Sequence, residues 1–247
     1  MTMKTVIKGL GVVAAATGLS VAAMAEETKG TWDFSLGATN NYMFRGISQS
    51  DNDPAVFGSV EFGHSGFAVG AWASSIDFDT DPGAKVEIDL YAGYTHSFND
   101  NTSAGIKAIY YYYPGADTPD ASYWEFIGNL EHNFGRFTGN LQVGYAPEYF
   151  GNTGSATWVS LGGKTALTEW LEFSANAGYQ SFDDNALVVL PDYWHGDIGF
   201  TATYDIASLD VRYVASDIGT VSCFGGSDTC DDTLVVTLSI ALSSGGE

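Results

Sequence analysis

The chain has 247 residues, of which 30 are acidic and 9 basic, so its formal net charge at pH 7 is −21. Binding to nucleic acid requires clustered lysine and arginine side chains, and we therefore expect no nucleic-acid partner. After residue 25 no run of about twenty apolar residues occurs, which excludes a transmembrane helix there. The length suits one large all-β domain.

The chain opens with a segment typical of a secretory signal peptide. Lys4 and Lys8 precede an apolar run, and Ala23-Met24-Ala25 has the small-x-small form of a cleavage site. We expect residues 1–25 to be removed on export and residues 26–247 to form a single domain.

Beyond this leader, apolar residues recur at every second position in a series of short segments. In the first segment Trp32, Phe34 and Leu36 alternate with polar or small residues, and the clearest alternation runs from Val86 to Tyr94. A strand with one apolar and one polar face produces this period, and about nine residues suffice for a tilted strand to cross a bilayer. In chain order the segments are 32–39, 56–62, 67–74, 86–94, 106–112, 124–131, 137–145, 156–165, 171–180, 194–204, 209–213 and 234–242. The segment 156–165 is too weakly patterned for its faces to be assigned.

The linkers between these segments alternate between short and long. The short ones are 63–66, 98–103, 133–136, 166–169 and 205–208, and the long ones are 45–53, 75–85, 114–121, 146–155, 181–192 and 217–232. An up-and-down barrel with both chain ends at one rim produces this order. We therefore predict a transmembrane antiparallel β-barrel of about twelve strands, with short periplasmic turns and long extracellular loops, in the outer membrane of a Gram-negative bacterium.

A secreted soluble β-sandwich or barrel would also alternate apolar with polar residues. Aromatic residues at the strand ends favour the membrane barrel. Trp32, Phe62, Phe67, Phe137, Trp170 and Tyr204 lie by the short turns, and Tyr112, Trp124, Tyr145, Tyr179 and Trp194 lie by the long loops. Two such groups are typical of the aromatic girdles at membrane interfaces, and bulky apolar residues are sparse on the opposite face.

Most charged residues of the strands fall on the face predicted to line the lumen. They are Glu61, Glu87, Asp89, Glu125, Glu131, Glu172, Asp197 and Asp210 among the acids, against Lys107 and Arg212. A water-filled lumen with this balance concentrates cations and repels anions. The alternative is that these carboxylates pair across the wall with lysine and arginine, or are simply hydrated.

Arg45 is the most informative single cation, because it stands in the first long linker. Two roles are open for it. It could fold into the lumen and narrow the pore, or tie down its own loop through a carboxylate such as Asp51, which the ordered turn expected at Gly46 favours.

Two further features lie in the long linkers. Cys223 and Cys230 stand close together in an exported chain, which predicts a local disulfide rather than a metal site. The segment 77–83 places Asp77, Asp79 and Asp81 at alternate positions, as calcium loops do, but it lacks the glutamate that such a loop requires at position twelve. It is a weak candidate for a metal site, and a solvated acidic loop is the alternative.

Several sequence blocks together resemble one family. The segment from Asn41 to Ser50, followed by Pro54-Ala55-Val56, resembles the opening of the TorF family of porins, also described as the Gcw_chp type of conserved hypothetical domain. The blocks 66–74, 87–94 and 111–115 are similar to that family's later blocks. The resemblance implies a porin-like role in the outer membrane without defining a substrate.

The first functional hypothesis is a passive, cation-preferring channel for small solutes. Outer-membrane lipid and lipopolysaccharide are the expected surroundings, with divalent cations at the acidic loops as a further possibility, and no cofactor is expected. The alternatives are a non-conducting structural or adhesion barrel, and an outer-membrane lipid hydrolase. A hydrolase would need a serine near a histidine on the lipid-facing wall, whereas the four histidines lie near short turns or on the polar face.

Overall fold

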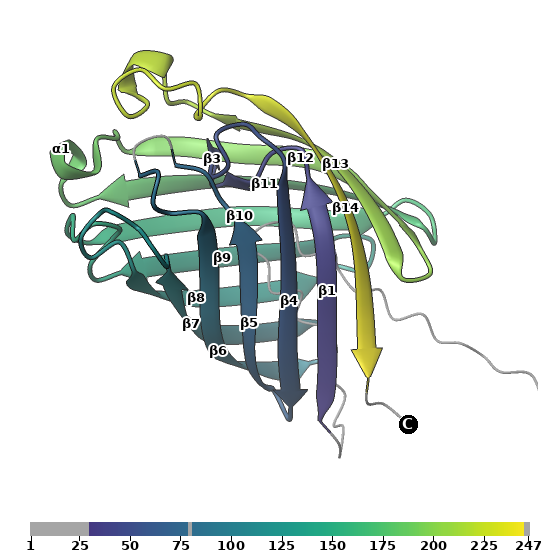
Figure 1. The fold of residues 1–247 in the computed structure, drawn as a ribbon. Helices are drawn as coiled ribbons and strands as arrows, with labels where there is room; N and C mark the ends of the chain where they lie inside the picture. Colours follow the sequence, from purple (N-terminus) through teal and green to yellow (C-terminus); the bar gives the residue numbers. More distant parts are fainter. Residues whose placement is uncertain (1–29, 79–80, 245–247) are drawn as a thin grey trace, which may run out of the picture.

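Twelve antiparallel strands close into a barrel (Figure 1). The computed structural model describes residues 30–78 and 81–244, so the expected signal peptide lies outside the described residues. The wall strands are β1 (Thr31–Thr39), β4 (Ala55–His64), β5 (Phe67–Ser75), β6 (Val86–Asn99), β7 (Thr102–Tyr112), β8 (Tyr123–Asn133), β9 (Thr138–Ala146), β10 (Ala156–Ala166), β11 (Leu171–Phe182), β12 (Tyr193–Tyr204), β13 (Ala207–Ser216) and β14 (Thr233–Ser244). The predicted all-β class, closed barrel and strand number are confirmed.

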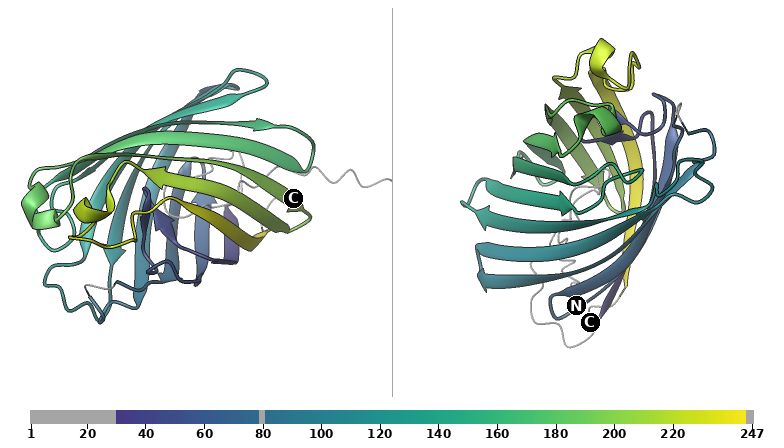
Figure 2. Two further views of the ribbon diagram at one scale, coloured as in Figure 1. Left: turned by 90° about the horizontal axis from the view of Figure 1, so that it is seen from above. Right: turned by 90° about the vertical axis from the view of Figure 1, so that its left-hand side faces the viewer.

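Each strand pairs with its neighbours in the chain, and β1 pairs with β14 to complete the ring. That last ladder runs from Trp32 opposite Ser244 to Thr39 opposite Thr237. Turns of two to four residues join strands at one rim, and loops of nine to sixteen residues join them at the other. The long loops gather at one end, opposite the described chain ends (Figures 1 and 2). We call these ends the short-turn rim and the long-loop rim.

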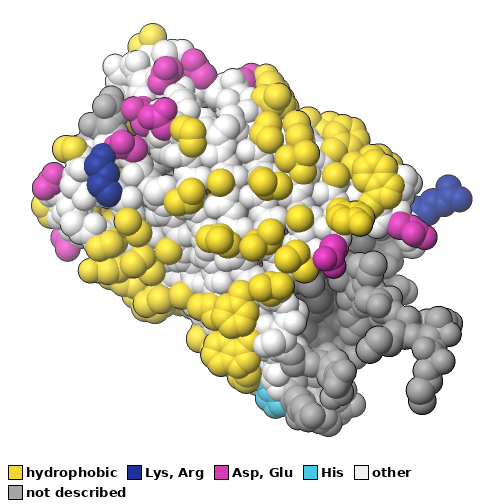
Figure 3. All heavy atoms as spheres, turned by 45° about the vertical axis from the view of Figure 1, so that its right-hand side comes forward, with side chains coloured by type: hydrophobic (Ala, Val, Ile, Leu, Met, Phe, Trp, Pro, Cys, Tyr) yellow, Lys and Arg dark blue, Asp and Glu magenta, His cyan; other side chains and the backbone are white. Residues whose placement is uncertain are grey.

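The outer face of the wall is apolar. In β1 the side chains of Trp32, Phe34 and Leu36 are exposed, while those between them are partly buried on the inside. Figure 3 shows apolar side chains spread over the barrel wall, with acidic side chains gathered mainly toward the long-loop end. The faces of β10, which the sequence left unassigned, are now clear because Val159 and Leu161 point outward and Trp158 points inward.

Aromatic side chains ring both ends of this outer face. Trp32, Phe67, Phe137, Trp170 and Tyr204 are exposed near the short turns, and Tyr112, Trp124, Tyr145 and Trp194 are exposed near the long loops. Within residues 30–78 and 81–244, no helix is long and apolar enough to cross a membrane.

The inside of the barrel differs from the sequence expectation at the long-loop end. Bulky apolar residues were predicted to be sparse on the inner face, yet a packed aromatic cluster fills this half of the lumen. Its members include Tyr42, Phe44, Phe57, Trp72, Tyr111, Tyr123, Trp158, Phe182 and Tyr193. Two of these residues, Tyr42 and Phe44, come from the first long loop, which folds back into the barrel.

Candidate functional site in the lumen

The first long loop forms a short hairpin that lies inside the barrel. Strands β2 (Met43–Phe44) and β3 (Ile47–Ser48) pair with each other, and residues 41–48 are all buried. Arg45 and Gly46 form the two-residue turn, with φ values of 50° and 82°. Positive φ at both positions is the geometry of a type I′ turn, which favours glycine at the second position. We refer to residues 43–48 as the lumen hairpin.

The hairpin region contacts strands on several sides of the barrel. The Tyr42 hydroxyl donates a hydrogen bond to Glu87 on β6 at 3.1 Å, and the Phe44 ring packs against Tyr111 on β7. At the tip, a Cβ added to Gly46 would lie 3.0 Å from the Cβ atoms of His195 on β12 and Ser216 on β13. The hairpin therefore spans the lumen near the long-loop rim.

Arg45 anchors the tip of the hairpin to the wall. Its Nη2 lies 2.6 Å and 2.8 Å from the two carboxylate oxygens of Glu125 on β8, and its Nη1 donates to Gln180 Oε1 on β11 at 3.2 Å. The guanidinium also stacks on two aromatic rings, 4.4 Å from the centroid of Phe44 and 4.2 Å from that of Trp158. Of the two roles open for Arg45, the structure places it inside the lumen, and its ion-pair partner is a wall residue rather than a loop carboxylate such as Asp51.

Glu125 accepts further hydrogen bonds that hold it in place. Trp158 Nε1 donates to it at 2.9 Å and the Tyr111 hydroxyl at 3.2 Å. Trp158 can lie against the wall because its partner on β9 is Gly144, where an added Cβ would come within 2.0 Å of Nε1. The side chains of Arg45 and Glu125 are each only 1% exposed, so this is a buried ion pair. Both carboxylate oxygens of Glu125 and both terminal nitrogens of Arg45 have partners, whereas Arg45 Nε is buried without one.

A second group of charged residues lies on the wall between β4 and β7. Glu87 and Asp89 are buried neighbours on the inner face of β6, beside Tyr42. Lys107 on β7 forms no direct ion pair among the described residues, but it interacts electrostatically with Glu125, Asp89 and Glu61, and its Nζ lies 5.7 Å from the centroid of the Tyr91 ring. These carboxylates are thus partly compensated by a single lysine.

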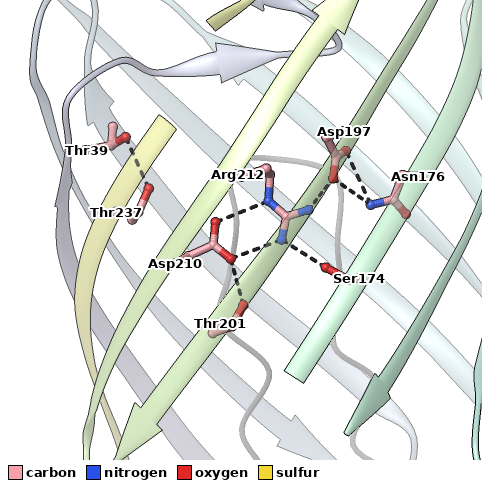
Figure 4. A network of polar contacts seen from close by, with 8 residues as sticks. All are labelled: Thr39, Ser174, Asn176, Asp197, Thr201, Asp210, Arg212 and Thr237. Carbon is pink, nitrogen blue, oxygen red and sulfur yellow. Dashed lines mark hydrogen bonds and ion pairs between the residues drawn. The ribbon is translucent and has the colours of Figure 1, made fainter. Parts of the chain in front are cut away.

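Arg212 on β13 connects a third group, nearer the middle of the barrel (Figure 4). It binds Asp210 through Nε at 3.2 Å and Nη2 at 3.1 Å, and it pairs with Asp197 on β12 through Nη1. Nη2 also donates to Ser174 at 3.0 Å, and the Thr201 hydroxyl donates to Asp210 at 2.7 Å. Asn176 donates to Asp197 in the same network. Two of the predicted lumen carboxylates therefore share one arginine as their counterion.

A cavity of about 230 Å³ lies between the lumen hairpin and the short-turn half of the barrel. Its charged lining residues include Glu131, Lys164 and Glu172, whose side chains form no ion pair or hydrogen bond with other residues in the described part of the chain. Its neutral polar lining residues include Asn140, Gln142, Ser160, Asn176 and Thr237. The short-turn half of the lumen is therefore polar, in contrast to the aromatic half above it.

Sequence reasoning missed three residues of this site. Lys164 and Trp158 both lie on β10, whose weak alternation concealed its inner face. Gln180 fell on the predicted inner face of β11, but its contact with Arg45 depends on how the hairpin folds inward. A tryptophan opposite a glycine on the neighbouring strand is the only local signal for Trp158, and strand register is needed to recognise it.

The acidic segment 77–83 is part of an anchored loop. Asp81 is 2% exposed, and its two carboxylate oxygens accept hydrogen bonds from the backbone N–H groups of Asp117 and Thr118, each at 2.8 Å. Burial opposes ionisation of this carboxyl, but the hydrogen bonds from Thr118, Asp117 and Ala84 outweigh it and lower its pKa. Asp77 pairs with Lys85 at 2.5 Å, and Asp79 lies outside the described residues. Among the described residues no group of three or more metal-ligating side chains comes together.

Cys223 and Cys230 form the predicted disulfide, in the loop between β13 and β14. This loop lies against the hairpin, because the backbone N–H of Ser48 donates to the Thr229 carbonyl at 2.7 Å. The Asn52 side chain also donates to Asp228 at 3.2 Å. The disulfide loop thus supports the hairpin from the long-loop rim.

A family model described as "Bacterial protein of unknown function (Gcw_chp)" matches residues 25–242. The chain belongs to the Gcw_chp family. The match covers the barrel strands from β1 to β13 and all but the last two residues of β14. No curated protein matches the sequence.

Solved structures share the fold of this Gcw_chp protein at very low sequence identity. The KdgM porin is 6% identical with a TM-score of 0.55, covering 88% of this chain and 99% of that one. The NanC porin is 7% identical with a TM-score of 0.56, covering 87% and 100%. An outer membrane channel from Pseudomonas putida F1 is 10% identical with a TM-score of 0.50, covering 96% and 100%. The chain therefore has the fold of outer-membrane porins.

Proposed function

We propose that this Gcw_chp protein is an outer-membrane channel for passive diffusion of small solutes, with a preference for cations. Support comes from an apolar outer wall with two aromatic rings, which suits a lipid environment, combined with a polar lumen. The porin fold agrees with this reading. The resemblance of residues 41–56 to the TorF porins and the signal peptide predicted for residues 1–25 point in the same direction.

The orientation follows from the same features. In outer-membrane barrels short turns face the periplasm and long loops face the outside. The acidic loops and the disulfide would then be extracellular, beside lipopolysaccharide. Divalent cations shared between loop carboxylates and lipopolysaccharide are a proposed interaction at this surface.

The observation that carries the cation preference is the charge of the inner wall. Within the described residues, the inward-facing acids are Asp33, Glu61, Glu87, Asp89, Glu125, Glu131, Glu172, Asp197 and Asp210, and the inward-facing cations are Arg45, Lys107, Lys164 and Arg212. Part of this charge is paired, as for Arg212 with its two aspartates, so the preference would be moderate. The surplus of carboxylates still gives the lumen a negative potential.

A second candidate, a non-conducting structural or adhesion barrel, is favoured by one specific observation. The lumen hairpin and the aromatic cluster occupy the long-loop half of the lumen, where a solute would have to pass. We do not propose the lipid hydrolase, because it needs a serine bonded to a histidine, and within residues 30–78 and 81–244 the hydroxyl that bonds a histidine is that of Thr102, to His132.

Planar-bilayer recording of the refolded mature chain separates the two candidates. The channel proposal predicts discrete current steps whose size depends on the cation when K⁺ is replaced by a bulky organic cation. A variant in which residues 43–48 are replaced by a glycine-serine linker should conduct more. If that variant is silent as well, the channel proposal is wrong and the structural barrel stands.

A further inference from the structure

We propose that the lumen hairpin is a displaceable plug, latched by insertion of Arg45 into a guanidinium site on the wall formed by Glu125, Trp158 and Gln180. This inference rests on the proposed channel function. It adds that the structure represents the closed state, and that release of one side chain opens the lumen.

Arg45 makes most of the polar contacts between the hairpin and the wall. Arg45 makes hydrogen bonds to two wall strands and stacks on Trp158 of a third, β10. Within the described residues, it forms the only ion pair between the hairpin and the wall. The other contacts of the hairpin region are aromatic packing and single hydrogen bonds, such as that from Tyr42 to Glu87.

The wall site is built to receive a guanidinium group. The Glu125 carboxylate and the Gln180 side-chain carbonyl accept hydrogen bonds from a planar guanidinium group, and the Trp158 ring provides a flat surface on which it stacks. Donors from Trp158 and Tyr111 hold the carboxylate in position on its other side. Only the Phe44 ring is contributed by the hairpin itself, so the site would persist on the wall after the hairpin leaves.

The hairpin is suited to movement because, apart from its covalent stem, side-chain contacts such as those of Arg45 and the hydrogen bond from Ser48 to Thr229 hold it, and no pairing with a wall strand does. Its strands pair only with each other and not with the barrel sheet, so its release breaks no ladder hydrogen bond of the wall. On its short-turn side lies the polar cavity. Displacement of the hairpin would therefore connect this cavity with the long-loop rim.

The primary test is single-channel recording of the refolded mature chain carrying Glu125→Gln. Loss of the carboxylate charge leaves Arg45 buried without a counterion, which favours expulsion of the hairpin, and we expect the open probability to rise at least about tenfold. Glu131→Gln is the matched control, since Glu131 lies on the same face of β8 and carries the same charge but does not touch the hairpin. It should alter ion selectivity without a comparable change in open probability.

Two further arms test the chemistry of the latch. Arg45→Lys keeps the charge but loses the planar fork, so its open probability should lie between those of the wild type and Glu125→Gln. Guanidinium chloride at tens of millimolar, compared with NaCl at equal ionic strength, should compete for the wall site and increase opening of the wild type. Equal responses to both salts would contradict a guanidinium site.

A cross-link tests whether the hairpin must move. Gly46→Cys with Ser216→Cys places two Cβ atoms about 3.0 Å apart, and a shift of the tip by about half an ångström allows a disulfide. Because a side chain at φ 82° strains the turn by itself, the reduced double-cysteine protein is the reference for the oxidised one. In a Cys223→Ser/Cys230→Ser background, with that background alone as control, oxidation should abolish opening and reduction should restore it.

Conductance that persists in the cross-linked protein would overturn the plug while leaving the channel proposal intact. So would equal open probabilities for Glu125→Gln and Glu131→Gln in variants whose barrel is folded, as judged by heat-modifiable mobility on gels. Silence of the variant without residues 43–48 would instead overturn the channel proposal itself.

Discussion

Arg45 and Glu125 lie 80 positions apart in the chain, yet Arg45 Nη2 approaches Glu125 Oε2 to 2.6 Å inside the barrel. This pair joins the tip of the first long loop to the wall strand β8. It explains how a hairpin of six residues, too short to be stable alone, holds one conformation.

Removal of one member of the pair should loosen the hairpin while the barrel remains folded. Loss of one partner of a buried ion pair commonly costs about 3–5 kcal/mol, because the other charge is left without compensation. For Glu125→Gln we expect faster amide hydrogen exchange in residues 42–49 and unchanged protection in β9 to β14. Unchanged exchange in the hairpin would show that aromatic packing and the other hydrogen bonds hold it without the ion pair.

In the double variant Arg45→Gln/Glu125→Gln, the opening free energy of the hairpin should fall by less than the sum of the decreases in the two single variants. Both single changes remove the same interaction, and in the double variant no charge is left buried. Hydrogen exchange of the hairpin amides gives the three opening free energies. Strict additivity would indicate that the two side chains are not coupled.

The loop anchor at Asp81 should be sensitive to acid. The pKa of Asp81 is lower in the folded protein than in the unfolded chain, where it is about 3.9. The stability that ionised Asp81 gives to the loop is therefore fully present above about pH 3.9, and it is lost as the pH falls through the folded pKa. Limited proteolysis of the loops 76–85 and 113–122 should therefore increase at strongly acidic pH with an acid-stable protease, while the barrel resists.

Asp81→Asn should loosen the same loops at neutral pH. The amide side chain has one acceptor oxygen, so one of the two backbone N–H groups loses its partner, which should lower the stability of the loop by about 1–3 kcal/mol. Asp77→Asn is the matched control. Asp77 forms an ion pair with Lys85 in which both side chains are about half exposed, and exposed ion pairs contribute little to stability. Similar proteolysis of the two variants would contradict the assigned role of Asp81.

Arg212→Gln should increase the preference for cations. The change releases Asp197 and Asp210 from their shared counterion and adds to the negative potential of the lumen. We expect the ratio of K⁺ to Cl⁻ permeability to rise roughly threefold, as measured from reversal potentials in a KCl gradient. A fall in that ratio would mean that this network lies away from the ion path.

Reduction of the disulfide between Cys223 and Cys230 should loosen the loop between β13 and β14 without unfolding the barrel. A disulfide that closes a loop of this size adds about 2–3 kcal/mol to stability, because it restricts the unfolded chain. Because Ser48 bonds to Thr229 in this loop, the hairpin should also exchange faster. The comparison is hydrogen exchange with and without a reductant, and no change at Ser48 would contradict the support assigned to the loop.

The sequence predicted the wall well because a strand with two different faces produces a period of two. Residues such as Trp32 and Leu36 reveal the outer face directly, and the linker lengths reveal which rim each turn occupies. The faces of β10 could not be assigned from the sequence. Trp158, the largest side chain of that strand, faces inward beside Gly144 and so contradicts the pattern of apolar residues on the outer face.

The interior of the lumen was less predictable, because it depends on which wall residues a loop meets when it folds inward. Arg45 and Gly46 indicated a turn, but the sequence could not show that Glu125, Gln180 and Trp158 converge on it from three strands. Strand register and barrel closure bring these residues together, and neither is encoded in local spacing.

The most direct test of the central claim is the reversal potential of the refolded wild-type chain in a tenfold KCl gradient across a planar bilayer. An acidic lumen behind a displaceable hairpin predicts intermittent openings whose reversal potential has the sign for K⁺ over Cl⁻. A reversal potential of the opposite sign, or a silent bilayer with both the wild type and the variant lacking residues 43–48, would contradict it.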